Sequence, residues 1–226
     1  GGATSAINVT ENTAAVTTVT ATDADLPAQT LVYSISGGLD ATKFTINSSS
    51  GALSFITAPN YEVPTDNGAN NVYNVTVQVS DGTFTDTQAI SVTVTNTNDT
   101  VPVVTLGQTF VVSELAANGT SVGSVAATDA DGSTAFNGWA ITAGNNSGVF
   151  AINAATGVIT VVNRTSLNFD LTPSYALSLT VSDGVNTSSA QTITINVTDS
   201  PNAAPVAIDD SYTLLEGGTL NQSVVS

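Results

Sequence analysis

The sequence of 226 residues contains no cysteine and no histidine. Without cysteine the chain can form no disulfide and carries no thiol nucleophile. Without histidine it lacks the commonest general base and a common zinc ligand. No other pairing of a nucleophile with a base stands out, so we expect a protein that is not an enzyme.

Basic residues are nearly absent as well. Lys43 and Arg164 stand against 18 acidic residues, which leaves a formal net charge of -16. Nucleic acids and anionic membranes attract proteins through basic surfaces, so neither is an expected partner. No apolar run reaches the roughly 18 residues that span a bilayer, so we expect no direct membrane insertion of this chain. The excess of acids indicates cations as partners.

The residues that are present alternate in the manner of β-strands. In YNVTVQVSD (73–81), Tyr73, Val75, Val77 and Val79 fall on one face, and polar residues fall on the other. Such period-two alternation indicates a half-buried antiparallel sheet. About seven such segments per ~100 residues, separated by turns rich in Gly, Asn and Asp, predict an all-β fold of β-sandwiches.

The sequence repeats itself. The second copy matches the first at ATDAD (21–25 and 127–131), at VSDG (79–82 and 181–184) and along the last strand (89–99 and 191–201). We therefore predict a first repeat at 1–98, a second at 99–200 and the truncated start of a third at 201–226. The chain opens without Met and stops within a repeat, so we expect it to be an internal fragment. An extra stretch, VPTDNGANN (63–71), is expected to form a solvated loop of the first repeat.

Most of the acids recur at equivalent places in the copies. Two like charges 4 Å apart repel by ~4 kcal/mol at an effective dielectric of about 20, so acids gathered without basic partners need bound cations or protons. Ligands that offer only oxygen favour a hard cation, and a flexible mixture of carboxylates, amides and carbonyls suits calcium better than magnesium. The recurring acids are Glu11, Asp23, Asp25, Glu62, Asp81, Asp99, Glu114, Asp129, Asp131, Asp170, Asp183, Asp199 and Glu216.

In order and spacing these motifs resemble the cadherin repeat. The first copy offers Glu11, TDAD, NYE (60–62), VSDG and NTNDTVP (96–102), and the second offers Glu114, TDAD, NFD (168–170), VSDG and DSPNAAP (199–205). The composition resembles cadherin-like repeats of large bacterial surface or secreted adhesins. The resemblance implies tandem seven-stranded Greek-key sandwiches of immunoglobulin-type architecture, arranged end to end. It also implies an extracellular place on a bacterial cell surface, and a calcium-dependent role in structure and adhesion.

The same resemblance places several Ca²⁺ ions at the junctions between repeats. For the first junction it implies the ligands Glu11, Asn60, Glu62, Asn98, Asp99, Thr100 (through its carbonyl), Asp129, Asp131 and Asp183. Pro201 and Asn202 replace Asn and Asp at the second junction, which is therefore expected to hold a weaker or partial site of Glu114, Asn168, Asp170, Asp199 and Asn202. The N-terminal tip lacks an upstream partner, so weak binding is expected at Asp23, Asp25 and Asp81.

Other interpretations remain open. Further repeats of the same polypeptide are the expected partners, and an alternative is a calcium-dependent module that recognises a cell-surface glycan or another copy of itself. Tyr61 and Phe169 precede ligand acids and are a weak hint of sugar stacking. Paired carboxylates can also serve a glycosidase, but metal binding explains each pair better. Tyr33, Phe44, Trp139 and Phe150 are expected in the cores.

Overall fold

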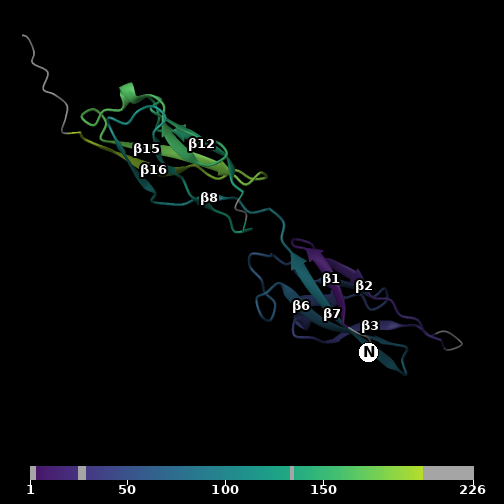
Figure 1. Ribbon diagram of the computed structural model, residues 1–226. Helices are drawn as coiled ribbons and strands as arrows, with labels where there is room; N and C mark the ends of the chain where they lie inside the picture. The colour runs from purple at the N-terminus through teal and green to yellow at the C-terminus, as the bar shows by residue number, and fades with distance from the viewer. Residues whose placement is uncertain (1–3, 25–28, 133–134, 201–226) are drawn as a thin grey trace, which may run out of the picture.

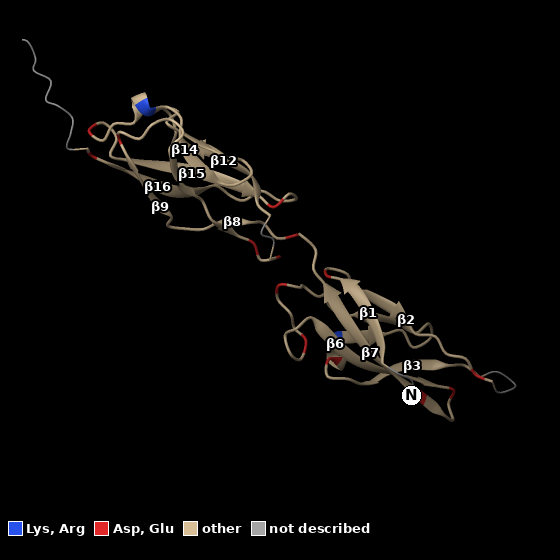
Figure 2. Cartoon of the chain, viewed as in Figure 1, with Lys and Arg blue, Asp and Glu red and all other residues tan. Residues whose placement is uncertain are grey.

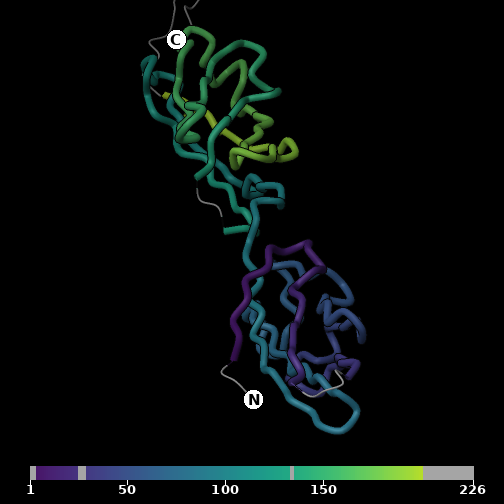
Figure 3. Tube along the Cα trace, turned by 90° about the vertical axis from the view of Figure 1, so that its right-hand side faces the viewer, coloured from purple at the N-terminus to yellow at the C-terminus, as the bar shows by residue number. Residues whose placement is uncertain are grey.

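The computed structural model describes residues 4–24, 29–132 and 135–200. Two β-sandwiches follow each other end to end along an extended molecule, joined by a short linker (Figures 1 and 3). We name them repeat one, which contains β1 to β7, and repeat two, which contains β8 to β16. The predicted sites at Asp25 and Asn202, and the predicted third repeat, lie outside the described residues.

Repeat one consists of two facing sheets. One has the strand order β1-β7-β6-β3 and the other β2-β5-β4. The first strand pairs in parallel with the last, and the other pairings are antiparallel. The strands are β1 Ser5–Thr10, β2 Ala15–Thr18, β3 Val32–Gly37, β4 Phe44–Ile46, β5 Ala52–Phe55, β6 Val72–Ser80 and β7 Thr85–Thr95, with the 3-10 turn η1 at Ala41–Lys43.

Repeat two has the same plan, with sheets ordered β12-β15-β16-β9 and β10-β14-β13. The first strand of this repeat is divided into two parts, β8 and β9. The first part, β8, lies next to the linker and pairs antiparallel with β11. The predicted all-β class of tandem sandwiches is confirmed. The strands are β8 Val103–Val104, β9 Thr109–Ser113, β10 Ser121–Ser124, β11 Ala127–Thr128, β12 Asn137–Ala143, β13 Phe150–Ile152, β14 Val158–Val161, β15 Ser174–Ser182 and β16 Gln191–Thr198, with the 3-10 turn η2 at Arg164–Ser166.

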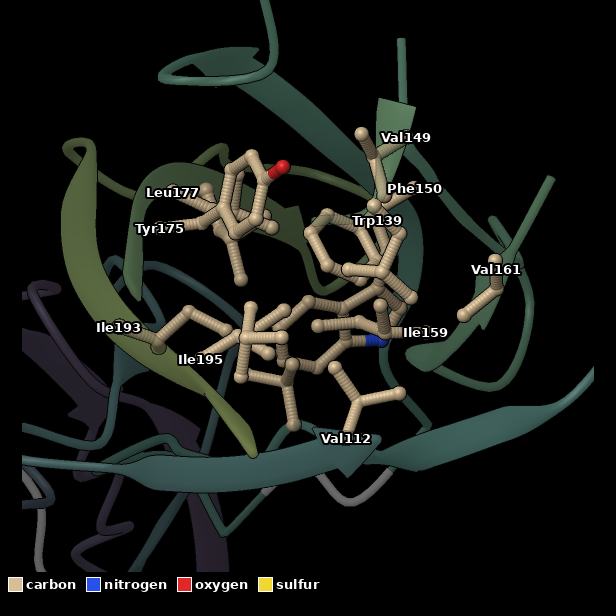
Figure 4. Packing of buried hydrophobic residues seen from close by; sticks show 14 of the residues in the cluster. Val112, Trp139, Val149, Phe150, Ile159, Val161, Tyr175, Leu177, Ile193 and Ile195 are labelled. Carbon is tan, nitrogen blue, oxygen red and sulfur yellow. The ribbon is translucent and has the colours of Figure 1, made fainter. Parts of the chain in front are cut away.

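Each sandwich has a core of its own. The alternation in β6 buries Tyr73, Val75 and Val77 as predicted, whereas Val79, near the end of the strand, is only half-buried. In repeat two, side chains of both sheets meet around Trp139 (Figure 4). The four aromatic residues predicted for the cores are all buried: Tyr33, Phe44, Trp139 and Phe150.

The last strands of the two repeats align differently from the sequence comparison. Ile90, Val92 and Val94 of β7 take the buried positions that Ile193, Ile195 and Val197 take in β16. Matching residues 89–99 with 191–201 was therefore wrong by one residue. Both strands consist of short Thr, Val and Ile residues that suit either face of a sheet, so the pattern alone defines the register weakly. In the corrected register, Asp99 corresponds to Asn202, as the comparison of the two linkers predicted, and not to Pro201.

The predicted solvated loop at 63–71 is a loop, but buried carboxylates hold it. Asp66 is 8% exposed and accepts hydrogen bonds from the backbone N–H groups of Asn70 and Asn71, both at 3.0 Å. Asp40 is 3% exposed and accepts the N–H groups of Asn67 at 2.6 Å and Asn74 at 2.8 Å. These two acids, which no repeat pattern explained, organise the backbone of the loop.

Replacing Asp66 by alanine is expected to destabilise repeat one by about 1–3 kcal/mol, because two backbone donors lose their acceptor. Urea unfolding followed by far-UV circular dichroism measures the change. The matched control is Asn67→Ala, a change at an exposed side chain of the same loop. An equal loss in both variants contradicts a specific role for Asp66.

Candidate metal centre

The predicted ligands of the first junction lie at chain turns where the two sandwiches face each other. Glu11 follows β1, Asn60 and Glu62 lie between β5 and β6, and Asp183 lies between β15 and β16. Asn98, Asp99 and Thr100 form the linker after β7, and Asp129 and Asp131 follow β11. Acidic segments gather at these facing ends, with no basic residue between them (Figure 2).

Glu11 is the most buried acid of the junction, at 3% exposure. Its Oε1 accepts the backbone N–H of Thr97 at 2.8 Å and the Thr97 hydroxyl at 3.1 Å, and its Oε2 accepts the N–H of Tyr61 at 2.8 Å. Burial acts to raise the pKa of Glu11, but these hydrogen bonds outweigh it, and the pKa lies below its ordinary value. The ionised carboxylate thus ties the start of the linker to the loop that carries Glu62.

Four carboxylates meet beside this anchor, and we call them the junction cluster. One oxygen from each lies within 4.8 Å of the others: Glu11, Glu62, Asp99 and Asp131. Burial raises the pKa of Glu62, and the neighbouring carboxylates Asp131 and Glu11 raise it further. Repeat one, the linker and repeat two all contribute, so a cation here would touch all three.

Hydrogen bonds from the linker fix the orientation of the Asp131 carboxylate. Its Oδ2 accepts the backbone N–H of Thr100 at 2.8 Å and the Thr100 hydroxyl at 2.6 Å. Burial acts to raise the pKa of Asp131, but the bonds from Thr100 prevail and the pKa lies below its ordinary value. Its other oxygen, Oδ1, is buried and receives no donor.

Buried oxygen atoms without a hydrogen-bond donor are the strongest sign of a cation site. Such orphaned acceptors carry a desolvation penalty that a cation removes. All of them are carboxylate or amide oxygens, which are the ligand atoms that calcium prefers. The residues at this junction therefore fit the ion that the repeat pattern implies. At this junction they are Glu62 Oε1 and Oε2, Asn98 Oδ1, Asp129 Oδ2, Asp131 Oδ1 and Asp183 Oδ2.

In two predicted ligands the expected oxygen already accepts a hydrogen bond from the protein. Asn60 Oδ1 accepts the backbone N–H of Val63 at 2.8 Å, which closes its own loop. The Thr100 carbonyl, the predicted ligand atom, accepts a bond from Asn186 Nδ2 at 2.9 Å, and the Thr100 hydroxyl faces the acids. Both residues lie at the junction, and their role as ligands stays a prediction.

Three asparagine residues at the junction were not among the predicted ligands. Asn12 Nδ2 donates to Asp99 Oδ2 at 2.6 Å, and Asn186 binds the linker at Thr100. Asn96 Nδ2, on the side of repeat one, donates to the Asp131 carbonyl of repeat two at 2.8 Å. An amide bears no charge, so no pattern of acids could have revealed these residues.

The far end of repeat two contains the predicted acids, but they are more exposed to solvent than those of the first junction. Glu114 repeats the contacts of Glu11, since it accepts the N–H groups of Phe169 at 3.1 Å and Ser200 at 2.9 Å. Asn168 Oδ1 closes its loop by accepting the Leu171 N–H at 2.9 Å. Asp170 and Asp199 are exposed. Metal binding at this end stays a prediction.

The N-terminal tip repeats one element of the junction. Asp81 Oδ1 accepts the N–H groups of Thr83 at 2.6 Å and Phe84 at 2.7 Å, and Asp183 uses its Oδ1 in the same way in repeat two. These bonds hold the pKa of Asp81 below its ordinary value. Asp23 is half-buried after β2, on the wall of a groove that Asp81 also lines.

The signs of a sugar or substrate site weaken in the structure. Tyr61 and Phe169 pack, partly buried, against the two hydrophobic cores instead of offering a free ring face. A groove of about 450 Å³ in repeat one is lined by Thr42, Lys43, Phe55, Ile56, Thr57, Ala58, Pro59, Asn60, Val63, Thr65 and Tyr73, with no carboxylate among them.

Comparison with known proteins identifies the fold and its repeats. Residues 5–96 and 108–198 each match the family model described as cadherin domain. The chain belongs to the cadherin family. Cadherin domains are in general calcium-dependent adhesion modules without enzymatic activity.

Relatives of this cadherin are large animal proteins. It is 37% identical over 198 residues to protocadherin Fat 4 of Mus musculus. This alignment covers 84% of this chain and 4% of the mouse protein. It is 34% identical over 212 residues to protein dachsous of Drosophila melanogaster, covering 88% of this chain and 6% of that protein. The chain thus spans only a small part of the curated relatives that it matches.

Solved cadherin structures share the fold. Mouse cadherin-23 EC22-24 superposes with a TM-score of 0.67 at 24% identity, covering 89% of this chain and 66% of that one. Human protocadherin-24 EC1-2 superposes with a TM-score of 0.66 at 23% identity, covering 87% of this chain and 95% of that one.

Within the described residues, no helix has the length and apolar character to cross a membrane.

Proposed function

We propose that this chain is a calcium-clamped pair of cadherin domains that stiffens an extended surface protein involved in adhesion. The carrying observation is the set of buried oxygens without donors where the two sandwiches meet. Calcium bound there would take ligands from repeat one, the linker and repeat two at once. Glu11, Glu62, Asn98, Asp99, Asp129, Asp131 and Asp183 would hold the ions, with Asn60 and Thr100 beside them.

The mechanism of the clamp is electrostatic. Without a cation, two carboxylates about 4 Å apart would repel by ~4 kcal/mol at an effective dielectric of about 20, and the linker around residues 95–103 would flex. With calcium the same oxygens are attracted to shared ions, and the angle between the repeats becomes fixed. Binding also stabilises the chain by mass action, by ~2.7 kcal/mol at a free calcium concentration of 100 times Kd.

We infer repeat boundaries at 1–98 and 99–200, with further repeats of the same polypeptide as partners and weaker sites at the two outer ends. We also infer a bacterial cell-surface or secreted adhesin. That inference rests on a composition without cysteine and with two basic residues. The relatives described above come from animals and add nothing to it.

A calcium titration against chelator tests the function. We expect calcium to raise the melting temperature and to narrow the distribution of interdomain distances, because the linker no longer flexes. Small-angle X-ray scattering and differential scanning calorimetry measure the two effects on the whole chain. If neither the scattering profile nor the melting temperature responds to calcium, the clamp does not exist.

A further inference from the structure

Asn12 has an unusual backbone that directs its side chain at the linker. Its φ is +59°, in the left-handed region where asparagine is among the few residues that are tolerated. Its backbone N–H donates to the Pro59 carbonyl at 2.8 Å, which fixes the turn after β1. From this turn its Nδ2 donates to Asp99 Oδ2 at 2.6 Å, across 87 positions of sequence.

Asp99 is the only exposed acid of the junction cluster. Glu11 and Asp131 each accept several donors, and both are more buried than Asp99, which is exposed in the linker. A free carboxylate on a flexible linker samples several rotamers, and each one that is lost on metal binding lowers the affinity. One hydrogen bond to Oδ2 restricts that rotation.

We propose that Asn12 is a positioning residue of the metal centre, whose amide orients the Asp99 carboxylate into the junction cluster before any cation binds. The inference rests on the proposed function, since it concerns the same calcium site. Asn12 touches no ion in this account. It acts through Asp99, by reducing the ordering that binding requires.

Repeat two provides an internal comparison. The residue after Glu114, which corresponds to Glu11, is Leu115, and its side chain is 56% exposed and can donate no hydrogen bond. Its φ lies outside the left-handed set in which Asn12 falls. At the position equivalent to Asn12, repeat two therefore offers no side-chain amide, and the sequence after β16 also replaces the linker residues Asn98 and Asp99 by Pro201 and Asn202.

The test removes the amide without straining the turn. Glycine adopts a left-handed φ freely, so Asn12→Gly keeps the backbone and deletes only the side chain. We expect calcium affinity, measured by isothermal titration calorimetry on the whole chain, to fall about tenfold, as for a charge-assisted hydrogen bond of about 1.4 kcal/mol. The melting temperature in chelator should stay within about 2 °C, because the bond is exposed and its loss affects mainly the site.

The variant Asn12→Asp distinguishes an amide that orients Asp99 from a residue that matters only because it lies near the site. If Asn12 mattered only as a nearby group, an added carboxylate would raise calcium affinity, and such a rise overturns the proposal. Under the proposal the added carboxylate repels Asp99 and affinity does not increase. Unchanged affinity in Asn12→Gly also overturns it.

Asp99→Asn keeps the two proposals apart. If the unaltered chain binds calcium, Asp99→Asn weakens binding and Asn12→Gly does not, then the clamp stands and the positioning role is rejected. If the unaltered chain binds no calcium at all, the proposed function itself fails.

Discussion

Asp131→Asn is expected to lower the calcium affinity of the junction about 100-fold, equivalent to about 2.7 kcal/mol. Asp131 belongs to the junction cluster, and its buried Oδ1 has no donor. The amide removes one negative charge, and its NH₂ group must face either the Thr100 donors or the ion. Either orientation replaces an attraction by a repulsion. Calorimetric titration of the whole chain measures the affinity.

The effect of Asp131→Asn should reverse without calcium. Removing one of four neighbouring carboxylates reduces their repulsion, so in chelator the variant should be at least as compact by small-angle scattering as the unaltered chain. Asp86→Asn is the matched control, since it removes the same charge at an exposed residue of β7 that belongs to no predicted metal site. Equal loss of affinity in both variants would mean that net charge alone governs binding.

Gly144→Ala is expected to destabilise repeat two by about 3–5 kcal/mol. Gly144 follows β12 at a φ of +84°, and an added Cβ would lie 1.8 Å from the Ala176 carbonyl oxygen. That atom belongs to the backbone of β15, which cannot move without breaking its ladder to β16. Left-handed strain and a backbone clash therefore act together.

A second glycine separates the two causes. Gly148 has a φ of +61°, but nothing lies within 4 Å of an added Cβ, so Gly148→Ala should lose only about 1–2 kcal/mol, from left-handed strain. Urea unfolding in excess calcium measures both variants. Trp139, the single tryptophan of the chain, is buried in repeat two, and its fluorescence therefore follows that repeat. Similar losses in both glycine variants would contradict the clash.

Much of the candidate site could be predicted because carboxylates are conspicuous in this chain. An acid without a basic partner must be solvated or neutralised, and acids at matched positions of two repeats indicate a shared reason. The acids predicted in this way include Glu11, Glu62, Asp99 and Asp131, and the structure brings one oxygen of each within 4.8 Å of the others. Asp40 and Asp66 were overlooked, because a buried acid that accepts backbone N–H groups of a loop present in only one repeat leaves no trace in a repeat pattern.

The uncharged partners could not be predicted. Asn12 and Asp99 are 87 positions apart, and pairs that join the first and last strands of a repeat, such as Glu11 and Thr97, are 86 apart. Whether such an amide meets a carboxylate depends on a turn with positive φ and on the strand register, and the register was itself off by one residue in the sequence comparison. Neither composition nor spacing contains this information.

The sequence by itself determined the all-β class, the repetition of two sandwiches and the gathering of acids at their ends. These follow from period-two alternation, from turn residues and from the near absence of basic side chains, all of which are local or compositional properties. Only the tertiary structure decided which oxygens lie buried without donors, which are already bound by Thr97, Tyr61 or Thr100, and that an asparagine holds Asp99. The physical reason is that hydrogen bonds act over about 3 Å, and only the folded chain brings distant residues to that separation.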